Sequence, residues 1–354
     1  MKIALLNDTH CGVRNNNQQF AEYQGRFYTE IFFPYLDKHN IKQIIHLGDY
    51  FDRRRDVNFY SLHKNHEHFL QPMVEKDIKM DLIVGNHDIY FKSTNALNSP
   101  DFLLKNPNIN VYTDPITKNY DGLDIVLLPW INDENKEEVE DYLSLVEAPV
   151  VMSHLEVNGG MMSPGHYHGG GTPQTWFNRF EQVYSGHFHH KNDDGQVYYL
   201  GNQYEITWSD YKNQKGFHVF DTETRDVEFV PNPNTMFIKL QYDDILVNYD
   251  KIDITEYNQK YVKLVVVNKK DNEMFDRLLE RLYSDISVHE LKILEDYSDL
   301  SAASVSDDVV EGSEDTMNLV SNYVDQLKVD LDKDRLKVMI KEMYIEAQDT
   351  DAIK

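Results

Sequence analysis

The sequence predicts an α/β protein whose main unit is a β-sandwich of mixed sheets with helices packed outside. In the first 230 residues, short runs of β-branched and aliphatic residues alternate with amphipathic stretches of helical periodicity. Helical stretches at 20–39 and 57–77 separate the early runs, whereas the later runs follow closely on one another. This combination is typical of mixed sheets flanked by helices. The expected strands are "KIALL", "KQIIHL", "DLIV", "DIVLLP", "APVVMS", "EQVYS", "QVYYL", "GFHVF" and "DVEFV".

Changes in composition divide the chain into four parts. A turn-rich "PNPN" ends the main unit, which we place at 1–232. A smaller α/β unit is expected over 233–295, because two strand-like runs, one helical stretch and a last strand-like run follow one another there. An acidic linker over 296–314 and two amphipathic helices over 315–348, a helical hairpin, complete the predicted organisation.

The C-terminal helices carry apolar stripes. Between Lys292 and Lys328 the chain has nine acidic residues and no lysine or arginine, which indicates a solvated linker before the helices. The helices could pack on their own chain or dock against helices of another protein, and the pattern alone allows both. The residues expected to bind a partner are Val320, Val324, Leu327, Leu336, Met339, Ile340 and Met343.

Composition excludes several classes of protein. The 354 residues are 41% hydrophobic, enough for a substantial core, and no apolar run is long enough to span a bilayer. The N-terminus lacks the features of a secretory signal, and the single cysteine, Cys11, excludes an internal disulfide, so we expect a cytoplasmic protein. The net charge of −25 argues against a generally DNA-binding surface, so a phosphate polymer would have to be met by a local patch or by metal ions.

Five of the apolar runs end in side chains that bind metals. Because ligands collect at the carboxyl ends of strands in open α/β sheets, we expect these side chains to converge although they span 180 positions of sequence. The runs deliver Asp8 and His10, Asp49 and Asp52, Asn86, His87 and Asp88, His154, and finally His187 and His189. The sequence therefore predicts one shared site at a strand edge.

The spacing and the residue types indicate a two-metal site. In "DTH" and "HFH" the paired residues are two apart, so on an extended backbone both point to the same face. Gly48, Gly85 and Gly186 stand where a strand must turn sharply beside the site. Carboxylates, one asparagine and imidazoles suit manganese, iron or zinc better than magnesium. Seven ligands are too many for one ion and suit two ions that share a carboxylate.

In chain order these residues form "DxH", "GDxxD", "GNH", a single histidine and "GHxH". This order resembles the signature of the calcineurin-like metallophosphoesterases. The resemblance implies that one metal is held by Asp8, His10, Asp49 and His189, and the other by Asp49, Asn86, His154 and His187. Asp49 would then be the bridge.

The same resemblance implies catalytic roles for two further residues. His87 would stabilise the transition state or protonate the leaving oxygen rather than bind metal. Asp52, one short turn after the bridging carboxylate, would orient the His87 imidazole through its other nitrogen. Cellular relatives often carry histidine at the position of Asp52. The stretch "GDYFDR" also resembles serine/threonine protein phosphatases, in which the arginine grips phosphate, so Arg53 is a phosphate-binding candidate.

The stretches "SGHFHH" and "YYLGNQYEITWSDYKNQKGFHVFD" resemble nuclease subunits of the SbcD type, including those of large phages. The resemblance implies a DNA repair and recombination nuclease with a nuclease domain (1–232), a DNA-contacting capping domain (233–295) and a helical pair (315–348) that grips the coiled coil of an SMC-like ATPase. It further implies a homodimer with 3′–5′ double-strand exonuclease and single-strand endonuclease activity. Two manganese ions would serve this activity best, with magnesium less active.

Alternatives remain open at this stage. Arg53, Arg54 and Arg55 in "DRRRD" are expected to contact the DNA backbone, although the last two could equally belong to a solvated helix start. A metal-dependent protein or small-molecule phosphatase would use the same metal ligands. A non-catalytic scaffold that tethers DNA ends is the third reading, and the complete ligand set together with His87 argues against it.

Overall fold

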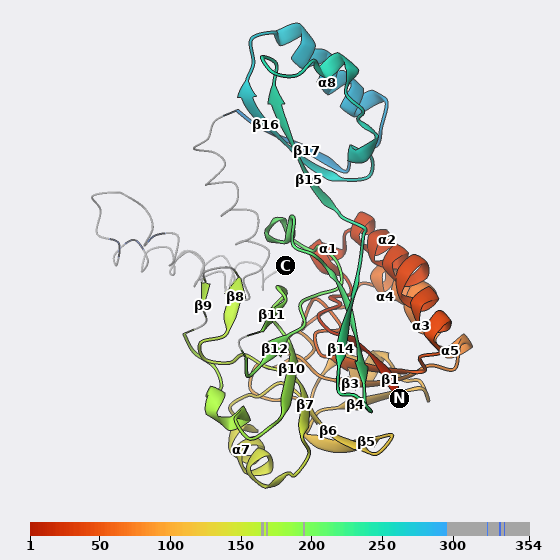
Figure 1. Ribbon diagram of the computed structural model, residues 1–354, viewed down its shortest axis with the longest axis vertical. Coiled ribbons are helices and arrows are strands. Elements are labelled where there is room, and N and C mark those ends of the chain that lie inside the picture. Colours follow the sequence, from red (N-terminus) through yellow and green to blue (C-terminus); the bar gives the residue numbers. More distant parts are fainter. Residues whose placement is uncertain are drawn as a thin grey trace, which may run out of the picture.

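Two six-stranded sheets form the body of the protein (Figure 1). The computed structural model describes residues 1–163, 166–167, 169–193 and 195–295, and residues 324, 333 and 336 beyond them. The first sheet has the order β14-β13-β1-β2-β3-β4. Its strands β1 to β4 are parallel, whereas β13 and β14 are added antiparallel at one edge. Their bounds are β1 Lys2–Leu6, β2 Gln43–Leu47, β3 Lys79–Ile83, β4 Ile109–Tyr112, β13 Gly216–Asp221 and β14 Val227–Pro231.

The second sheet has the order β11-β12-β10-β7-β6-β5. Its central strands are parallel, and the two edge strands, β11 and β5, run antiparallel to their neighbours. Their bounds are β5 Ile116–Tyr120, β6 Leu123–Leu128, β7 Val150–His154, β10 Gln182–Gly186, β11 Asn192–Asp193 and β12 Tyr198–Tyr199. A short hairpin of β8 (Met161–Ser163) and β9 (His166–Tyr167) lies outside both sheets. The expected class, mixed sheets flanked by helices, is confirmed.

Alternation of side chains along each strand builds three apolar layers. Ile3 and Leu5 of β1 face the second sheet and belong to the core between the sheets, together with residues such as Met152 of β7. Ala4 and Leu6 face the opposite way and pack against helices. On the outer face of the second sheet, a further cluster packs under α7 (Lys136–Leu145). Strands buried on both faces explain why the runs read as continuously apolar.

The helical stretches expected at 20–39 and 57–77 are interrupted by π-helical turns. The first consists of α2 (Gln18–Arg26), a π turn (Phe27–Phe32) and α3 (Phe33–His39). The second consists of α4 (Phe59–Asn65), a π turn (His66–Leu70) and α5 (Gln71–Glu75). Each π turn ends two residues before a proline, Pro34 or Pro72, whose ring clashes with the carbonyl of residue i−4 and which donates no backbone hydrogen bond. Asn17 and Asn58 cap the two stretches with their side chains.

The remaining short elements are irregular. The four-residue α1 (Val13–Asn16) contains three residues with positive φ, Arg14, Asn15 and Asn16. Short helices follow at α6 (Ser99–Leu103) and in 3₁₀ turns at Gln174–Phe177, Trp208–Asp210, Tyr249–Lys251 and Thr255–Tyr257.

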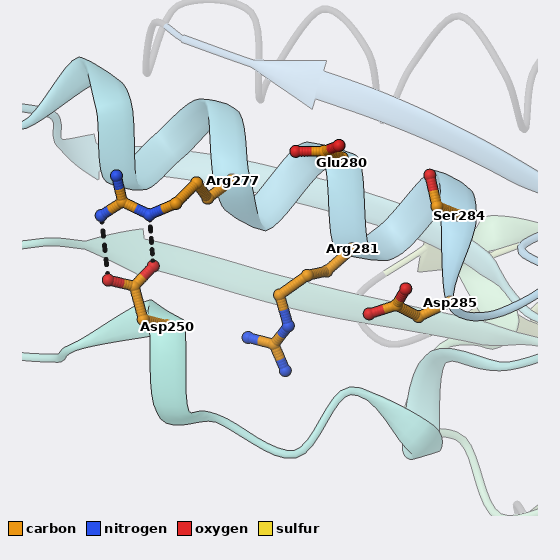
Figure 2. Close-up of a pocket in the computed structure, with 6 residues that line it drawn as sticks. All are labelled: Asp250, Arg277, Glu280, Arg281, Ser284 and Asp285. Carbon is orange, nitrogen blue, oxygen red and sulfur yellow. Dashed lines mark hydrogen bonds and ion pairs between the residues drawn. The ribbon is translucent and has the colours of Figure 1, made fainter.

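A three-stranded parallel sheet forms a separate unit at one end of the molecule (Figure 1). It consists of β15 (Phe237–Asp243), β16 (Tyr261–Asn268) and β17 (Glu290–Leu294), and α8 (Asn272–Ser284) supplies apolar residues to its core. Figure 2 shows the pocket beside α8, where Arg277 forms a two-bonded ion pair with Asp250 at 2.9 Å. Arg281 donates to two backbone carbonyls. These arginines therefore fasten α8 to the connection between β15 and β16.

Aromatic and cationic side chains join this unit to the sandwich. The Arg14 guanidinium lies 5.2–5.7 Å from the ring centres of Phe20, Phe237 and Tyr261. The Trp208 and Phe237 rings lie 4.7 Å apart. The buried Glu205 carboxylate accepts backbone N–H groups of residues 236 and 237, at 2.5 and 2.9 Å. The first strand of the small unit is therefore tied directly to the sandwich.

The expected linker (296–314) lies outside the described residues. Of the apolar residues predicted to bind a partner, Val324 is helical and buried and Leu336 is helical and partly exposed. The others, Val320, Leu327, Met339, Ile340 and Met343, lie outside the described residues. Within the described part of the chain, no helix has both the length and the apolar character needed to cross a membrane.

Candidate active site

Five strands from both sheets end at one place. β1, β2 and β3 of the first sheet and β7 and β10 of the second carry the candidate ligands at or just beyond their carboxyl ends. The side chains meet in three groups in which the nearest ligand atoms all lie within 4.8 Å of one another. The groups are Asp8, His10 and His189; Asp49, His154 and His187; and His10, Asp52 and His87. The convergence expected from strand order is therefore present in the structure.

The first group is centred on two imidazoles. Nε2 of His10 lies 3.1 Å from Nε2 of His189, and each nitrogen lies 3.9 Å from Oδ1 of Asp8. Asp8 and His10 are buried, and the side chain of His189 is 30% exposed. Three ligand atoms thus face one small volume that opens toward solvent at His189.

The Asp49 carboxylate lies between the first two groups. Its Oδ1 accepts the backbone N–H of His87 at 2.8 Å, which fixes the carboxylate plane. Its Oδ2 lies 3.3 Å from Nε2 of His154 and 4.0 Å from Nε2 of His10. One oxygen of Asp49 therefore reaches both groups while the other is held by the backbone.

Asn86 and a backbone carbonyl orient the second group. Oδ1 of Asn86 lies 2.9 Å from Nε2 of His154 and 3.0 Å from Nδ1 of His187. Nδ1–H of His154 donates to the carbonyl of Leu47 at 2.7 Å, so Nε2 is the ring nitrogen that faces the site. This outer hydrogen bond fixes the orientation of the ring, with Nε2 as the atom that could bind a metal.

The backbone at the site is strained. Asp8, His10, Asp49 and His187 all adopt positive φ, between 43° and 84°, which is uncommon for residues other than glycine. Such conformations persist where the surrounding structure determines them, and they concentrate at functional sites.

The three glycines predicted to turn the strands are packed against the ligands. A Cβ at Gly48 would lie 2.6 Å from Nδ1 of His154, and a Cβ at Gly85 would lie 2.2 Å from Oδ1 of Asp49. A Cβ at Gly186 would lie 2.9 Å from Oδ2 of Asp8. A side chain at any of these positions would occupy the space that the ligands need.

The charges of the site are strongly coupled. Burial by itself raises the pKa of the Asp49 carboxyl, but the neighbouring rings of His154, His87 and His10 outweigh burial and hold that pKa well below its usual value. Burial lowers the pKa of His154, and the Asp49 carboxylate outweighs it and raises the pKa to about 9. Burial holds the pKa of His189 well below its ordinary value, with a contribution from His10. The Asp49 carboxyl is therefore ionised at neutral pH.

His87 lies next to the first group. Nδ1–H of His87 donates to the backbone carbonyl of Asp52 at 2.6 Å, and its ring meets the His10 ring edge-to-face at 4.8 Å. The Asp52 carboxylate instead lies 3.4 Å from Nδ1 of His10. Residue 52 thus contacts His87 through its main chain, whereas its side chain approaches a candidate ligand.

The geometry agrees with what comparisons with known proteins show. A model of the calcineurin-like phosphoesterases matches residues 1–191, more than half of the chain. The chain belongs to the calcineurin-like phosphoesterase family. A protein of Enterobacteria phage T4 named Exonuclease subunit 1 is 29% identical over 351 residues, which cover 98% of this chain and 99% of that protein.

Two solved structures are more distant. A novel archaeal phosphodiesterase is 14% identical, with 66% of this chain and 100% of that chain covered and a TM-score of 0.33. A glutamine-dependent NAD⁺ synthetase from Acinetobacter baumannii is 12% identical, with 99% of this chain and 72% of that chain covered and a TM-score of 0.25. At these TM-scores neither structure bears on the fold.

The site of this phosphoesterase fits divalent cations. Its donors combine carboxylate and amide oxygens with imidazole nitrogens, a set that suits borderline metals. The imidazole nitrogens of His10 and His189 approach within hydrogen-bond distance in a carboxylate-lined site, and one oxygen of Asp49 is shared between the groups. The donor set therefore fits divalent cations, and the Asp49 oxygen faces both groups of candidate ligands.

Asp88 supports the phosphoesterase site without belonging to a ligand group. Its Oδ1 accepts the backbone N–H groups of Tyr50 and Phe51, and its Oδ2 accepts that of Gly85 at 2.9 Å. The carboxylate therefore ties the loop after β2 to the loop after β3. Burial, reinforced by the charge of Asp49, raises the pKa of Asp88 to about 7.

A buried ion pair supports His189 from the other side. Nζ of Lys215 lies 2.5 Å from the Asp210 carboxylate and donates to the carbonyl of His189 at 2.8 Å. Both side chains are at most 2% exposed. The pair lies in "WSDYKNQKG", a stretch that resembles nuclease subunits but in which the resemblance gives neither residue a role.

Of the three arginines that follow Asp52, Arg53 is engaged with neighbouring side chains. Arg53 donates to Oδ1 of Asn15 at 2.9 Å and lies 3.8 Å from Asp56. Arg54 is partly buried and Arg55 is exposed. They stay candidates for contact with a phosphate backbone.

Sequence reasoning missed Trp130. Its ring lies 5.3 Å from the His187 ring and 5.9 Å from the His154 ring, so it flanks the second group of ligands. Trp130 follows β6 by two residues, and β6 lies beside β7 in the second sheet. The signal was present in "DIVLLPW": a sixth apolar run ends at the same edge, but in an aromatic residue.

Proposed function

We propose that this chain is the nuclease subunit of a DNA repair and recombination complex, and that it hydrolyses DNA phosphodiesters with two divalent cations. The observation that carries the proposal is the position of Asp49, whose Oδ2 faces both His10 and His154. The 29% identity over nearly the full length of a phage exonuclease subunit favours DNA as the substrate.

Seven side chains would hold the cations. Divalent cations held there would supply charge stabilisation of phosphoryl oxygens and would lower the pKa of a water molecule. We assign one cation to Asp8, His10, Asp49 and His189 and the other to Asp49, Asn86, His154 and His187. Manganese matches this mixture of oxygen and nitrogen donors better than magnesium, which prefers oxygen and water.

His87 is the proposed catalytic residue outside the ligand set. Its Nδ1–H is engaged by the carbonyl of Asp52, so the neutral ring leaves Nε2 as its second functional atom. When protonated, Nε2–H can donate to a phosphoryl or leaving oxygen. Asp52 acts as a positioning residue: its carbonyl orients His87, and its carboxylate lies next to His10.

We assign DNA-backbone contacts to Arg53, Arg54 and Arg55, which follow Asp52 directly. The proposed activities are 3′–5′ exonuclease on double-stranded DNA and endonuclease on single-stranded DNA. An enzyme with a net charge of −25 needs such a local patch because its overall field repels DNA.

We further propose an SMC-like ATPase partner, bound by the helices over 315–348, and a homodimer in the cytoplasm. The relative's designation as a subunit supports a partner. One short segment supports the dimer, because it exposes five large apolar side chains between 38% and 63%: Tyr90, Phe91, Leu97, Phe102 and Leu103.

A gel assay with end-labelled DNA tests the activity. Duplex and single-stranded substrates are incubated with manganese, magnesium or chelator, and wild type is compared with His87→Ser. We expect cleavage with manganese, none with chelator, and a loss of roughly 10²- to 10⁴-fold in His87→Ser, the range for general acid–base catalysis. The matched control is His63→Ser, which removes an exposed histidine on α4 and should cleave like wild type.

Two measurements beside this assay, turnover of phosphomonoesters and titration with manganese, decide between nuclease, phosphatase and scaffold. If phosphomonoesters turn over far faster than any DNA substrate, the chain is a phosphatase. If His87→Ser cleaves DNA like wild type, the catalytic role of His87 is wrong even though the metal assignment can stand. If manganese does not bind, the scaffold reading replaces the enzyme.

A further inference from the structure

A hollow opens beside the second group of ligands. It has a volume of about 220 Å³ and is walled by residues of the β6–α7 loop, by the chain that follows β7, and by Gly171 and Thr172. His154, a proposed metal ligand, forms part of its wall, and Trp130 forms another part. The hollow is therefore adjacent to the proposed reaction centre.

The position of Trp130 is fixed relative to the ligands. Its backbone N–H donates to the carbonyl of Val84 at 2.9 Å, and its own carbonyl accepts the side-chain amides of Asn95 and Asn135 at 2.9 and 3.1 Å. The indole packs against the imidazoles of His187 and His154. An aromatic surface held this firmly loses little entropy when a ligand stacks on it.

The other lining groups favour a nucleobase over a second phosphate. Asp133 and Glu156 bring carboxylates to the wall, which repel phosphate but accept hydrogen bonds from exocyclic amines of bases. Ile131, which is partly exposed, adds apolar surface. A base presents an apolar face and polar edges, and this wall offers a partner to each.

Two donors of this wall are not engaged by the protein. Within the described ranges, no hydrogen bond or ion pair engages the indole N–H of Trp130 or the ammonium group of Lys136. Lys136 is exposed at the start of α7. It can reach a phosphate outside the hollow while Trp130 contacts a base inside it.

We propose that this hollow is a nucleoside subsite, in which the base next to the scissile phosphate stacks on Trp130 and Lys136 pairs with the adjoining phosphate. The subsite rests on the proposed function, because it receives the nucleoside of a strand whose phosphodiester lies at the metal ligands. Trp130 is then a substrate-binding residue that selects nucleotides over other phosphodiesters. Stacking accepts every base, so the subsite confers little sequence preference.

The test compares substrates with and without a base. Wild type, Trp130→Leu and Trp130→Phe are assayed with manganese on the p-nitrophenyl ester of thymidine 5′-phosphate and on methyl p-nitrophenyl phosphate. Trp130→Leu should lose roughly 5- to 150-fold in kcat/KM on the nucleotide ester only, matching the 1–3 kcal/mol that stacking contributes per base. Trp130→Phe keeps a ring and should retain most of the activity. Trp176→Leu, which replaces a partly buried tryptophan that does not line the hollow, is the matched control.

A second measurement needs no catalysis. Oligonucleotides that end in an adenine or in an abasic site are bound to the same proteins in chelator and followed by fluorescence anisotropy. Wild type should bind the adenine end more tightly than the abasic end by a factor in the same range, and Trp130→Leu should bind both equally.

The outcomes separate the two proposals. If Trp130→Leu weakens hydrolysis of both esters equally and keeps the preference for a base, Trp130 only supports the ligands and the subsite is wrong. If wild type hydrolyses neither ester with any metal, the proposed nuclease function fails, while the binding ratio still decides the subsite. If wild type hydrolyses both esters but shows no preference for a base, the function stands and the subsite falls.

Discussion

Replacement of Gly85 by alanine probes how closely two loops must approach to form the proposed metal site. Gly85 follows β3, and a Cβ at this position would lie 2.2 Å from Oδ1 and 2.4 Å from the backbone nitrogen of Asp49. The backbone of Gly85 does not have a positive φ, so alanine adds no conformational strain of its own. The perturbation is therefore a steric push on the carboxylate shared by the two ligand groups.

The structure sets the size of the effect. Contacts of a Cβ below 3.0 Å essentially never occur, so the distance to Asp49 must grow from 2.2 Å to at least 3.0 Å, by about 0.8 Å. Rotation of the Asp49 side chain cannot relieve the clash, because its backbone nitrogen is also too close. Overpacking of this kind costs about 1–3 kcal/mol of stability. A disturbed shell around a metal typically lowers metal affinity by roughly 10- to 100-fold.

Calorimetric titration with manganese and urea unfolding in chelator measure the two effects separately. The matched control is Gly169→Ala, because a Cβ at Gly169 meets nothing within 4 Å and its φ is not positive. We expect Gly85→Ala to bind manganese at least tenfold more weakly than Gly169→Ala. If the two variants bind manganese within about twofold of each other, the close approach of Gly85 and Asp49 is not needed and the reasoning is refuted.

Three further predictions follow from groups around the site. Lys215→Met leaves the buried Asp210 carboxylate unpaired and removes a hydrogen bond to the His189 carbonyl, so the free energy of unfolding in urea should fall by about 3–5 kcal/mol. Adding Asp210→Asn should restore part of this loss, and an unchanged stability of Lys215→Met would contradict the prediction. Burial raises the pKa of Glu205 to about 7, against an ordinary value of 4.5, so its contribution to stability is present below pH 4.5 and is lost as pH rises through 7. Glu205→Gln lacks this titration, and the stability of wild type relative to that variant should fall by up to about 3 kcal/mol between pH 4.5 and 8; parallel pH profiles of the two proteins would refute the assignment. Phe102→Glu replaces an apolar side chain that is 63% exposed with a charged one, in the segment proposed to form the dimer interface. Light scattering should therefore show a monomer for this variant, whereas an unchanged dimer would place the interface elsewhere.

The fold class and the chemistry of the candidate ligands follow from the amino-acid sequence. Apolar runs of strand length report burial on both faces directly, so nine of the twelve strands of the two sheets can be located from residue types alone. The edge strands β4, β5 and β11 match none of the expected runs, because edge strands are short or partly exposed. The pairs in "DTH" and "HFH", and the glycines beside Asp49 and Asn86, are local features of a short peptide. Side-chain type and spacing along the chain are sufficient for predictions of this kind.

The way in which these groups meet depends on the packing of the whole chain. Asp8 and His187 are 179 positions apart, and their contact depends on which edges of two separate sheets face each other. The single shared oxygen of Asp49 depends on a hydrogen bond from the backbone of His87, and backbone donors are the same at every residue. The packing of the whole chain also brings the main-chain carbonyl of Asp52 to His87 and places Trp130 beside the ligands. Contacts across sheets are set by strand order, register and loop path, which no short stretch of sequence contains.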